Sequence, residues 1–281
     1  EYRAWWADTG DPVSPDEWAA ARALATGETV LGDVVDIEGF DGSRKTILNS
    51  AVPTRDESGA VVGAVIVNED ITLRRKTEKA LAVRLKQQAV VAEIGRLALA
   101  HPDLRRVVEL TVRRIVETLE VDCSSVFELN ASGDFLTLVD GVGPGFERSA
   151  GTEIPAGPGS QAGFTVETGD PVLVEDFNLE TRFLDLDYVT AHGIRSSLSV
   201  PIPGRARPYG VLVTHSRSPR RFGEQDAHFL EAIANVLADA VERHMGERAI
   251  RDREERLHLV RLERHPRRGH AAGGRLRGRL Q

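Results

Sequence analysis

Apolar residues recur at alternating spacings of three and four along residues 71–99, a stretch without proline. These positions form a heptad seam, and six of its eight members are apolar: Leu73, Lys76, Ala80, Val83, Gln87, Val90, Ile94 and Leu97. Arginine, lysine, glutamate and glutamine surround the seam, as in a coiled coil. The pattern predicts a helix over 71–99 with a seam of about 37 Å at ~1.5 Å per residue. We expect this helix to pair with its twin in a dimer; the alternative is a helix that packs only on its own domain.

Three runs ahead of this helix alternate between apolar and polar residues and predict antiparallel strands at 29–37, 45–53 and 61–68. A short helix is expected before them, with Ser14 as its N-cap, Pro15 in the first helical position and Glu17 in the third. Asp70 can cap the long helix and favours its positive end. Three strands that lead directly into a helix make half of a sheet domain, which predicts a partial domain at 1–70.

A second pattern of helices and strands occupies residues 100–244. Asp103 can cap a helix whose apolar residues recur at helical spacing as far as Leu119. Strands are predicted at 123–129, 135–139, 171–175, 196–203 and 209–215, and an amphipathic helix at 224–243. Glycine-rich stretches at 141–145 and 155–163 are expected to be turns and a pocket lid, because neither fits a phosphate-binding motif. The fold class is therefore α+β, with an antiparallel sheet in the first segment.

Composition narrows the function classes. The chain has 281 residues, of which 41% are hydrophobic, enough for two domains with their own cores. No apolar run approaches the ~18 residues of a membrane helix, so no membrane span is expected. A net charge of −7 gives no reason to expect nucleic-acid binding by the folded part. The single cysteine excludes a disulfide framework, and we expect a cytoplasmic protein.

Residues 245–281 differ from the rest of the chain in charge. We expect a short charged helical stretch followed by a basic tail that is rich in arginine and glycine. Disorder is the default for such a composition, and a tail that binds nucleic acid or lipid is the alternative. Because the first residue is Glu1 rather than methionine, we expect a piece of a longer protein.

Residues 27–72 resemble the C-terminal half of a PAS sensor domain. The resemblance is carried by Asp41-Gly42-Ser43, Pro53, the turn at 56–59, Gly63 and Asp70-Ile71-Thr72. It implies that the Asp-Ile-Thr triplet marks the transition from the last strand to a signalling helix at 71–99. It also implies that most of a PAS cofactor pocket is absent, so we assign neither flavin nor haem; the identity of any cofactor stays unknown.

Residues 100–244 resemble a GAF domain over nearly their whole length. The resemblance is carried by VETGDPVLVEDF at 166–177, HGIRSSLSVPI at 192–202, Gly210-Val211-Leu212, Phe222 and Asp226. It implies an antiparallel sheet with a helical bundle on one face and a loop-roofed pocket for a small molecule on the other. It also implies that the first and last helices of the domain commonly form a dimer interface.

The ligand of this pocket is not identified by the sequence. Five aromatic residues and one serine are the candidates for its lining: Phe127, Phe164, Phe177, Phe183, Tyr188 and Ser197. The alternative is that at least half of the aromatic residues belong to the core. A cyclic nucleotide is a further possibility, but Ala227 stands where the cyclic-nucleotide motif of these domains has glutamate.

No catalytic or metal-binding residue is predicted. Cys123 lacks a basic neighbour in sequence, and a GAF enzyme that reduces free methionine sulfoxide would also need a resolving cysteine. We therefore expect Cys123 to be structural. His192 and His215 are too far apart in sequence for a metal motif, and we expect each to be solvated or hydrogen-bonded.

These patterns predict the sensory input region of a signal-transduction protein. We expect a homodimer formed through the helix at 73–97 and the terminal helices of the GAF domain, with an unknown small molecule as ligand. The alternative is a fragment of an enzyme, a sensor histidine kinase of a two-component system or a diguanylate cyclase. Its catalytic domain would lie outside this chain, since the sequence has no phospho-acceptor histidine box, no ATP-binding glycine boxes and no GGDEF stretch.

Overall fold

The computed structural model describes residues 3–146, 151–183 and 187–264. They fall into two compact units, Glu1–Lys86 and Gln87–Gln281. The predicted basic tail at 265–281 lies outside the described residues. Among the described helices, none combines the length and apolar character that a membrane crossing requires.

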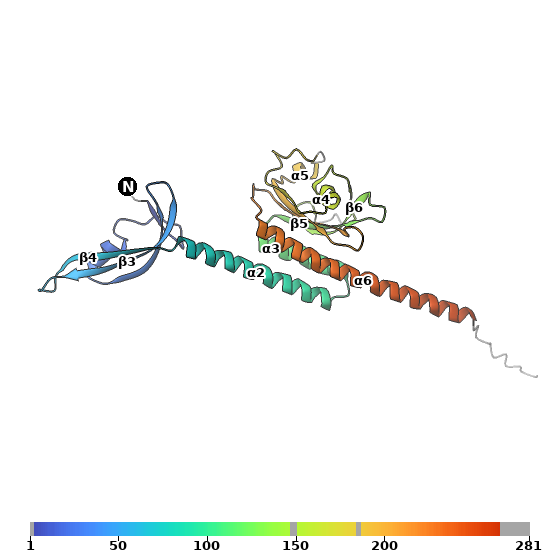
Figure 1. Ribbon diagram of the computed structural model, residues 1–281, viewed down its shortest axis with the longest axis horizontal. Helices are drawn as coiled ribbons and strands as arrows, with labels where there is room; N and C mark the ends of the chain where they lie inside the picture. Colours follow the sequence, from blue (N-terminus) through green and yellow to red (C-terminus); the bar gives the residue numbers. More distant parts are fainter. Residues whose placement is uncertain (1–2, 147–150, 184–186, 265–281) are drawn as a thin grey trace, which may run out of the picture. The chain divides into compact units, whose positions relative to one another are not determined.

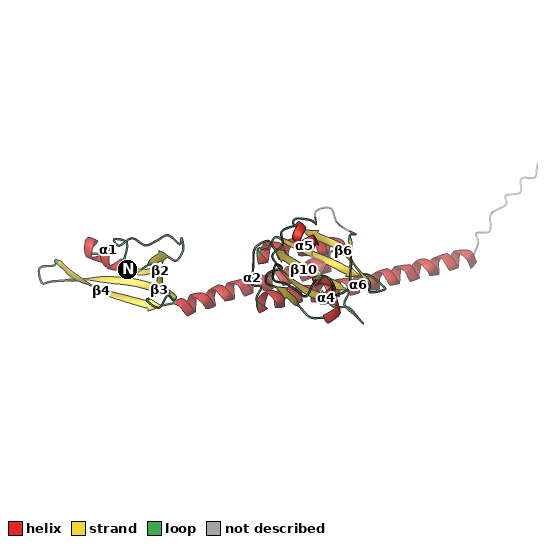
Figure 2. Ribbon diagram, turned by 90° about the horizontal axis from the view of Figure 1, so that it is seen from above, coloured by secondary structure: helices red, strands yellow, loops and turns green. Residues whose placement is uncertain are grey.

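The first unit is a four-stranded antiparallel sheet with the strand order β1-β2-β3-β4. Its elements are β1 (Ala4–Trp6), α1 (Ala19–Thr26), β2 (Val30–Glu38), β3 (Arg44–Arg55) and β4 (Val61–Asp70). The three predicted strands are confirmed as β2, β3 and β4. Strand β1 was not predicted, because three residues are too few to show an alternation. Helix α1 packs on the sheet, with Ala19 and Ala23 against Ala51 (Figure 2).

Helix α1 begins later than predicted. Ser14 is not its N-cap: the Ser14 N–H donates to Glu17 Oε2 at 2.9 Å, and the two residues close a turn ahead of the helix. The helix starts at Ala19, whose N–H donates to Oδ1 of the buried Asn49 at 3.2 Å. A side chain of β3, thirty residues away in sequence, therefore satisfies a free N–H group of the first turn.

Helix α2 (Thr72–Ala100) confirms the long helix predicted at 71–99. Asp70 accepts a hydrogen bond from the Thr72 N–H at 3.0 Å, so this carboxylate lies at the helix start as expected. The seam, however, is not open along its whole length. Leu73 and Val83 are 78% and 49% exposed, whereas Ile94 is completely buried in the second unit. The last turns of the helix thus pack on their own domain and its first turns leave the seam exposed, while pairing with a twin stays a prediction.

The second unit is built on a six-stranded antiparallel sheet with the order β7-β6-β5-β10-β9-β8 (Figure 1). Its strands are β5 (Cys123–Leu129), β6 (Phe135–Val142), β7 (Glu153–Pro155), β8 (Val172–Val174), β9 (Ser196–Ile202) and β10 (Gly210–Ser216). Its helices are the end of α2, α3 (Leu104–Leu119), α4 (Gln161–Thr168), α5 (Asp187–Ala191) and α6 (Glu224–Arg264). The predicted strands are confirmed, while the short elements β7, α4 and α5 were not predicted.

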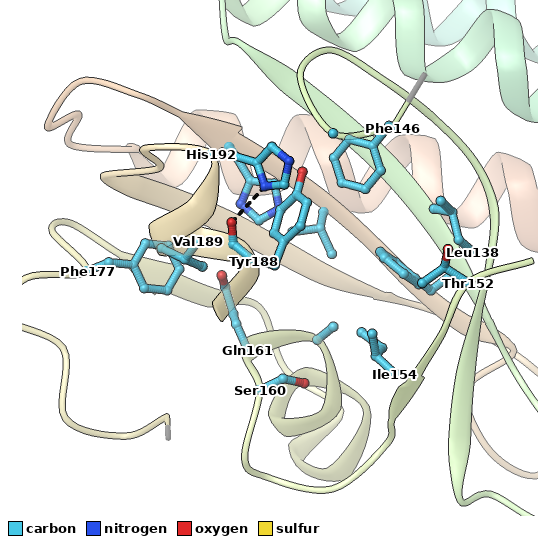
Figure 3. Close-up of a pocket in the computed structure, with 15 residues that line it drawn as sticks. Leu138, Phe146, Thr152, Ile154, Ser160, Gln161, Phe177, Tyr188, Val189 and His192 are labelled. Carbon is cyan, nitrogen blue, oxygen red and sulfur yellow. Dashed lines mark hydrogen bonds between the residues drawn. The ribbon is translucent and has the colours of Figure 1, made fainter. Parts of the chain in front are cut away.

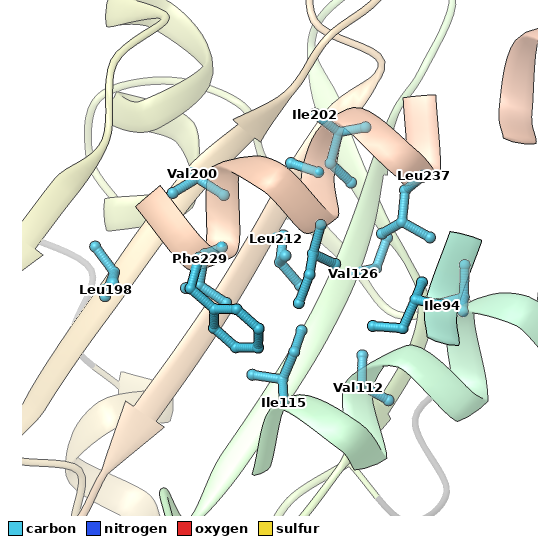
Figure 4. Close-up of a cluster of buried hydrophobic side chains, with 14 of the residues drawn as sticks. Ile94, Val112, Ile115, Val126, Leu198, Val200, Ile202, Leu212, Phe229 and Leu237 are labelled. Atoms are coloured by element: carbon cyan, nitrogen blue, oxygen red, sulfur yellow. The ribbon is translucent and has the colours of Figure 1, made fainter. Parts of the chain in front are cut away.

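Two apolar cores cover the two faces of this sheet. Successive residues of a strand point to opposite faces. On one face Val126, Val200 and Leu212 pack with residues of α2, α3 and α6 (Figure 4). On the other face Phe127, Val211 and Val213 belong to a second cluster beneath α4, α5 and the connecting loops (Figure 1). The sheet is therefore the partition between a helical core and a loop-covered core.

The start of α3 was predicted correctly, and the end of α6 was not. Asp103 caps α3 as expected, accepting from the Arg105 N–H at 3.0 Å. Helix α6 was predicted to end at 243, before a separate stretch, but it continues as one helix to Arg264. Gly246 alone does not end it, because an isolated glycine costs a helix only ~1 kcal/mol relative to alanine.

The packing of α2 can be tested with Ile94→Ala. We expect this change to lower the free energy of unfolding of the second unit by about 2–4 kcal/mol, since it leaves a cavity in the helical core. Leu99→Ala is the matched control on the same helix: Leu99 is 74% exposed, and its truncation should cost less than ~0.5 kcal/mol. Urea unfolding followed by circular dichroism measures both, and equal effects would contradict the assigned face of α2.

Candidate functional site

A cavity of about 370 Å³ lies on the loop-covered face of the second sheet (Figure 3). Five of its lining residues come from strands of the sheet: Phe127 from β5, Leu138 from β6, Ile154 from β7, and Val213 and His215 from β10. Val213 and His215 are two residues apart and so share a face of the strand. The floor of the cavity is thus the reverse side of the strands that carry the helical core.

The loop after β6 and helix α5 form one wall. The Tyr188 hydroxyl donates to the backbone oxygen of Pro144 at 3.2 Å. The backbone oxygen of Tyr188 lies 2.9 Å from His192 Nδ1. The rings of Tyr188 and His192 are 4.5 Å apart between centroids, and those of Phe146 and Tyr188 are 5.2 Å apart. Gly145 has a φ of +91°, and a Cβ there would lie 2.5 Å from His192 Nε2. The wall therefore needs glycine at this position.

Helix α4 forms the opposite wall. Ser160 caps it by accepting from the Gly163 N–H at 3.1 Å. Gln161 follows, and its Nε2 donates to the Val172 oxygen at 2.9 Å. The other end of this amide, Oε1, is buried without a hydrogen-bond partner in the structure. Both glycine-rich stretches thus border the cavity, one through Gly145 and the other through Ser160 and Gln161.

His215 is the second buried polar group at this site that lacks a partner. Its side chain is 7% exposed, and Nδ1 makes no hydrogen bond. Burial lowers the pKa of His215 from 6.5 to about 4, because the charged imidazolium is disfavoured away from water. The imidazole is therefore neutral at physiological pH. The residue is therefore not solvated, which was one of the two environments expected for His215.

The structure brings together three of the six predicted lining residues. Phe127, Phe177 and Tyr188 line the cavity. Phe164 and Phe183 do not: they pack against each other with centroids 5.6 Å apart, outside the cavity lining. Ser197 does not line it either, because its hydroxyl is buried and donates to the Thr214 oxygen at 2.9 Å.

Sequence reasoning did not identify the polar lining residues Gln161, His192 and His215. His215 pairs with Cys123 across the strands β10 and β5, and His192 follows the last residue of α5, where its ring lies against Gly145. A histidine in a strand and a glutamine in a short helix carry no local signal for a common site. Only their position on either side of one cavity connects them.

The chain's single thiol has the properties of a structural residue. Cys123 is completely buried, and burial together with the neighbouring Asp122 raises the pKa of its thiol to about 11. A thiol that stays protonated at neutral pH is a poor nucleophile. Among the described residues, no group of three or more His, Cys, Asp or Glu side chains could hold a metal ion. The described lining also contains no Asp, Glu, Lys or Arg.

The second unit is similar to known GAF domains in sequence and in structure. The family model of the GAF domain matches residues 103–241. No curated protein matches the sequence. Among solved structures, the GAF domain of a phosphoenolpyruvate-protein phosphotransferase from Coxiella burnetii is similar, with a TM-score of 0.54 and 21% identity over 59% of this chain and 98% of that one.

Two further structures are similar at a TM-score of 0.50. One is the GAF domain of an Acinetobacter phosphoenolpyruvate-protein phosphotransferase, at 20% identity over 57% of this chain and 95% of that one. The other is a free methionine-R-sulfoxide reductase from Neisseria meningitidis in complex with its substrate, at 24% identity over 57% of this chain and 91% of that one. Identities this low show a shared fold alone.

The neutral state of His215 predicts a pH dependence of stability. Between pH 6.5 and 4 the unfolded chain binds a proton at His215 that the folded chain does not, so stability falls as the pH falls through this window. At pH 4.5 this histidine should account for a loss of about 2–3 kcal/mol relative to pH 7. His215→Phe should remove that part of the loss, as measured by urea unfolding at the two pH values.

The matched control is His228→Phe on helix α6, because the side chain of His228 is 66% exposed. Carboxylates with lowered pKa values, such as Asp176 beside Arg195, contribute equally to wild type and variants and cancel in the difference. If His215→Phe and wild type lose the same stability on acidification, the buried neutral imidazole is refuted.

Proposed function

Because residues 103–241 form a GAF domain, a sensory and regulatory module found in signalling proteins, we propose that this chain is the input region of a signal-transduction protein. Its second unit binds a small molecule in the cavity and passes the change to the helices on the far side of the sheet. The single observation that carries the proposal is a mostly apolar cavity with two unpartnered polar groups among its lining residues. A buried polar group without a partner is costly, and a ligand can supply the missing hydrogen bond.

The sheet provides a short path from the cavity to the helices. On β10, Val213 and His215 line the cavity, while Leu212 packs into the helical core with residues of α6. A strand is one backbone thick, so a displacement of β10 by a ligand also moves Leu212 against the helices. Two-state shifts of packed helices are an established form of signalling in proteins.

Helices α2 and α6 receive this movement together. Arg243 on α6 donates from Nη1 to the oxygen of Ala98 in the last turn of α2 at 2.8 Å. This bond satisfies a free carbonyl of the helix end with a cationic side chain, which also suits the negative end of the helix dipole. We take α2 as the connection toward the first unit, which resembles half of a PAS domain, and α6 as the connection beyond the second unit.

The chain acts as a homodimer in this proposal. The uncovered part of the α2 seam, with Leu73 and Val83 exposed, supplies one contact. Met245 and Ile250 on the extended part of α6 are 62% and 61% exposed and supply a second. Because the seam beyond residue 87 is used inside the protomer, the paired region on α2 is shorter than the sequence pattern predicts. The single cysteine of the chain supports a cytoplasmic setting.

Occupancy of the cavity can be tested by native mass spectrometry of the purified protein. We expect a bound small molecule that is absent from Ala162→Phe, since a phenyl ring at this lining position fills the cavity. Ala131→Phe, at an exposed turn position, is the matched control and should keep the ligand. If wild type carries no added mass and no metabolite in a screening library raises its Tm above that of Ala162→Phe, the sensory cavity is refuted.

The dimer can be tested by sedimentation equilibrium. The double variant Leu73→Lys with Val83→Lys should weaken dimerisation at least ten-fold, because two charges at seam positions repel their symmetry mates. Leu179→Lys is the matched control: Leu179 is 80% exposed and lies in a loop of the second unit. A wild-type chain that sediments as a monomer at all concentrations would overturn the dimer and leave the cavity untouched.

A further inference from the structure

We propose that the cavity selects a small, flat, uncharged molecule that carries one hydrogen-bond donor, and that this donor binds Oε1 of Gln161. The inference rests on the proposed sensory function and specifies the chemical class of its ligand. Three properties of the described lining support it: its lack of charge, its aromatic walls and the fixed orientation of the Gln161 amide.

The absence of Asp, Glu, Lys and Arg from the described lining disfavours ionic ligands. No Asp, Glu, Lys or Arg side chain belongs to the described lining, and His215 at the floor is neutral. An ion transferred into such a site would lose its hydration without gaining a counter-charge, at a high energetic cost. A phosphate, a carboxylate or an ammonium group is therefore a poor fit for this lining, and so is a cyclic nucleotide.

The walls favour a flat ring system. Four aromatic side chains belong to the lining: Phe127, Phe146, Phe177 and Tyr188. The ring centroids of Phe146 and Tyr188 are 5.2 Å apart. Aromatic faces and edges bind a planar ring by stacking and edge contacts. A volume of about 370 Å³ is at the small end of ligand pockets, which suits one or two fused rings.

The orientation of Gln161 specifies the donor. Its amide nitrogen donates to the backbone oxygen of Val172 at 2.9 Å, and a carbonyl can only accept. The amide is thus fixed with its oxygen on the other side, where it points toward Val189 and Tyr188 (Figure 3). Gln161 is only 7% exposed, and its Oε1 has no hydrogen-bond partner. An acceptor in this position prefers a ligand with an N–H or O–H group and discriminates against an isostere without one.

His215 faces the same cavity and refines the class. Its neutral imidazole offers one nitrogen as donor and the other as acceptor, and Nδ1 is unpartnered. A ligand with a ring edge of mixed polarity can contact it without carrying a charge. The decisive contact remains the one to Gln161, because only that group has a fixed hydrogen-bonding sense.

Indole and benzofuran make a matched pair of probes, since both are flat two-ring molecules and only indole has an N–H. Isothermal titration of the full chain, freed of bound molecules, should give a dissociation constant at least ten-fold lower for indole than for benzofuran. Indole-3-carboxylate should not bind. Gln161→Met, which keeps the length of the side chain, should bind indole and benzofuran alike. Gln87→Met is the matched control and should keep the preference for indole, because Gln87 is equally buried but does not line the cavity.

The outcomes separate this inference from the proposed function. Equal binding of indole and benzofuran by wild type overturns the role of Gln161, while the sensory cavity stands. Stronger binding of the carboxylate overturns the uncharged class. If no probe binds but a native ligand is lost in Ala162→Phe, the proposed ligand class is wrong and the sensory cavity stands. If no probe binds and there is no native ligand either, the ligand class and the sensory cavity are both wrong. Should Gln161→Met fail to fold by circular dichroism, the ratio of the two probes on wild type decides alone.

Discussion

Every residue of β10 is buried, because the strand carries a helical core on one face and the cavity floor on the other. This double burial is the constraint from which the rest of the second unit follows. Gly210 at the start of the strand shows how tight the arrangement is: a Cβ there would lie 1.9 Å from the backbone oxygen of Phe127. The absence of a side chain lets β10 approach β5 and holds the centre of the sheet in register.

Polar side chains in this interior are mostly satisfied by the protein itself. Thr165 and Ser199 join α4 to β9 at 2.7 Å, and the hydroxyls of Ser124 and Thr214 donate to backbone oxygens of the neighbouring strand. Against that background the free polar atoms of Gln161 and His215 are conspicuous, since both belong to the cavity lining. Ser125 also has an unpartnered hydroxyl, but it does not line the cavity. Two of these three unpartnered atoms thus belong to lining residues of the cavity, and in the proposed function a ligand supplies their hydrogen bonds.

The heptad seam of α2 can be covered by the helix's own domain or by another chain. An apolar stripe lowers the free energy wherever it is covered, and the spacing of its residues does not specify the surface that covers it. Here the domain's own helices cover Ile94 and Ala98, and the seam from Leu73 to Val83 stays open. One helix is thus anchored in a folded core at one end and exposes its apolar stripe at the other, and the proposed relay uses both ends.

The sequence by itself determined the elements whose signals are local. Alternation gave β5 with its observed bounds, and Asp103 marked the start of α3, because side-chain facing and capping depend on residues within a few positions. The α+β class and the antiparallel sheets followed from the same signals. Short elements such as α5 carry too few residues to show a period.

Only the tertiary structure decided which residues share a site. The start of α1 is set by Asn49 from another strand, and the cavity joins Gln161 of α4 to His215 of β10. Phe164 and Phe183 fell outside it, since an aromatic residue packs equally well against a core or a ligand, and Ser197 fell outside it because its hydroxyl bonds to the neighbouring strand. The physical reason is the same in each case: burial and hydrogen bonding are fixed by partners that are distant in the chain, and the pairing of strands brings those partners together.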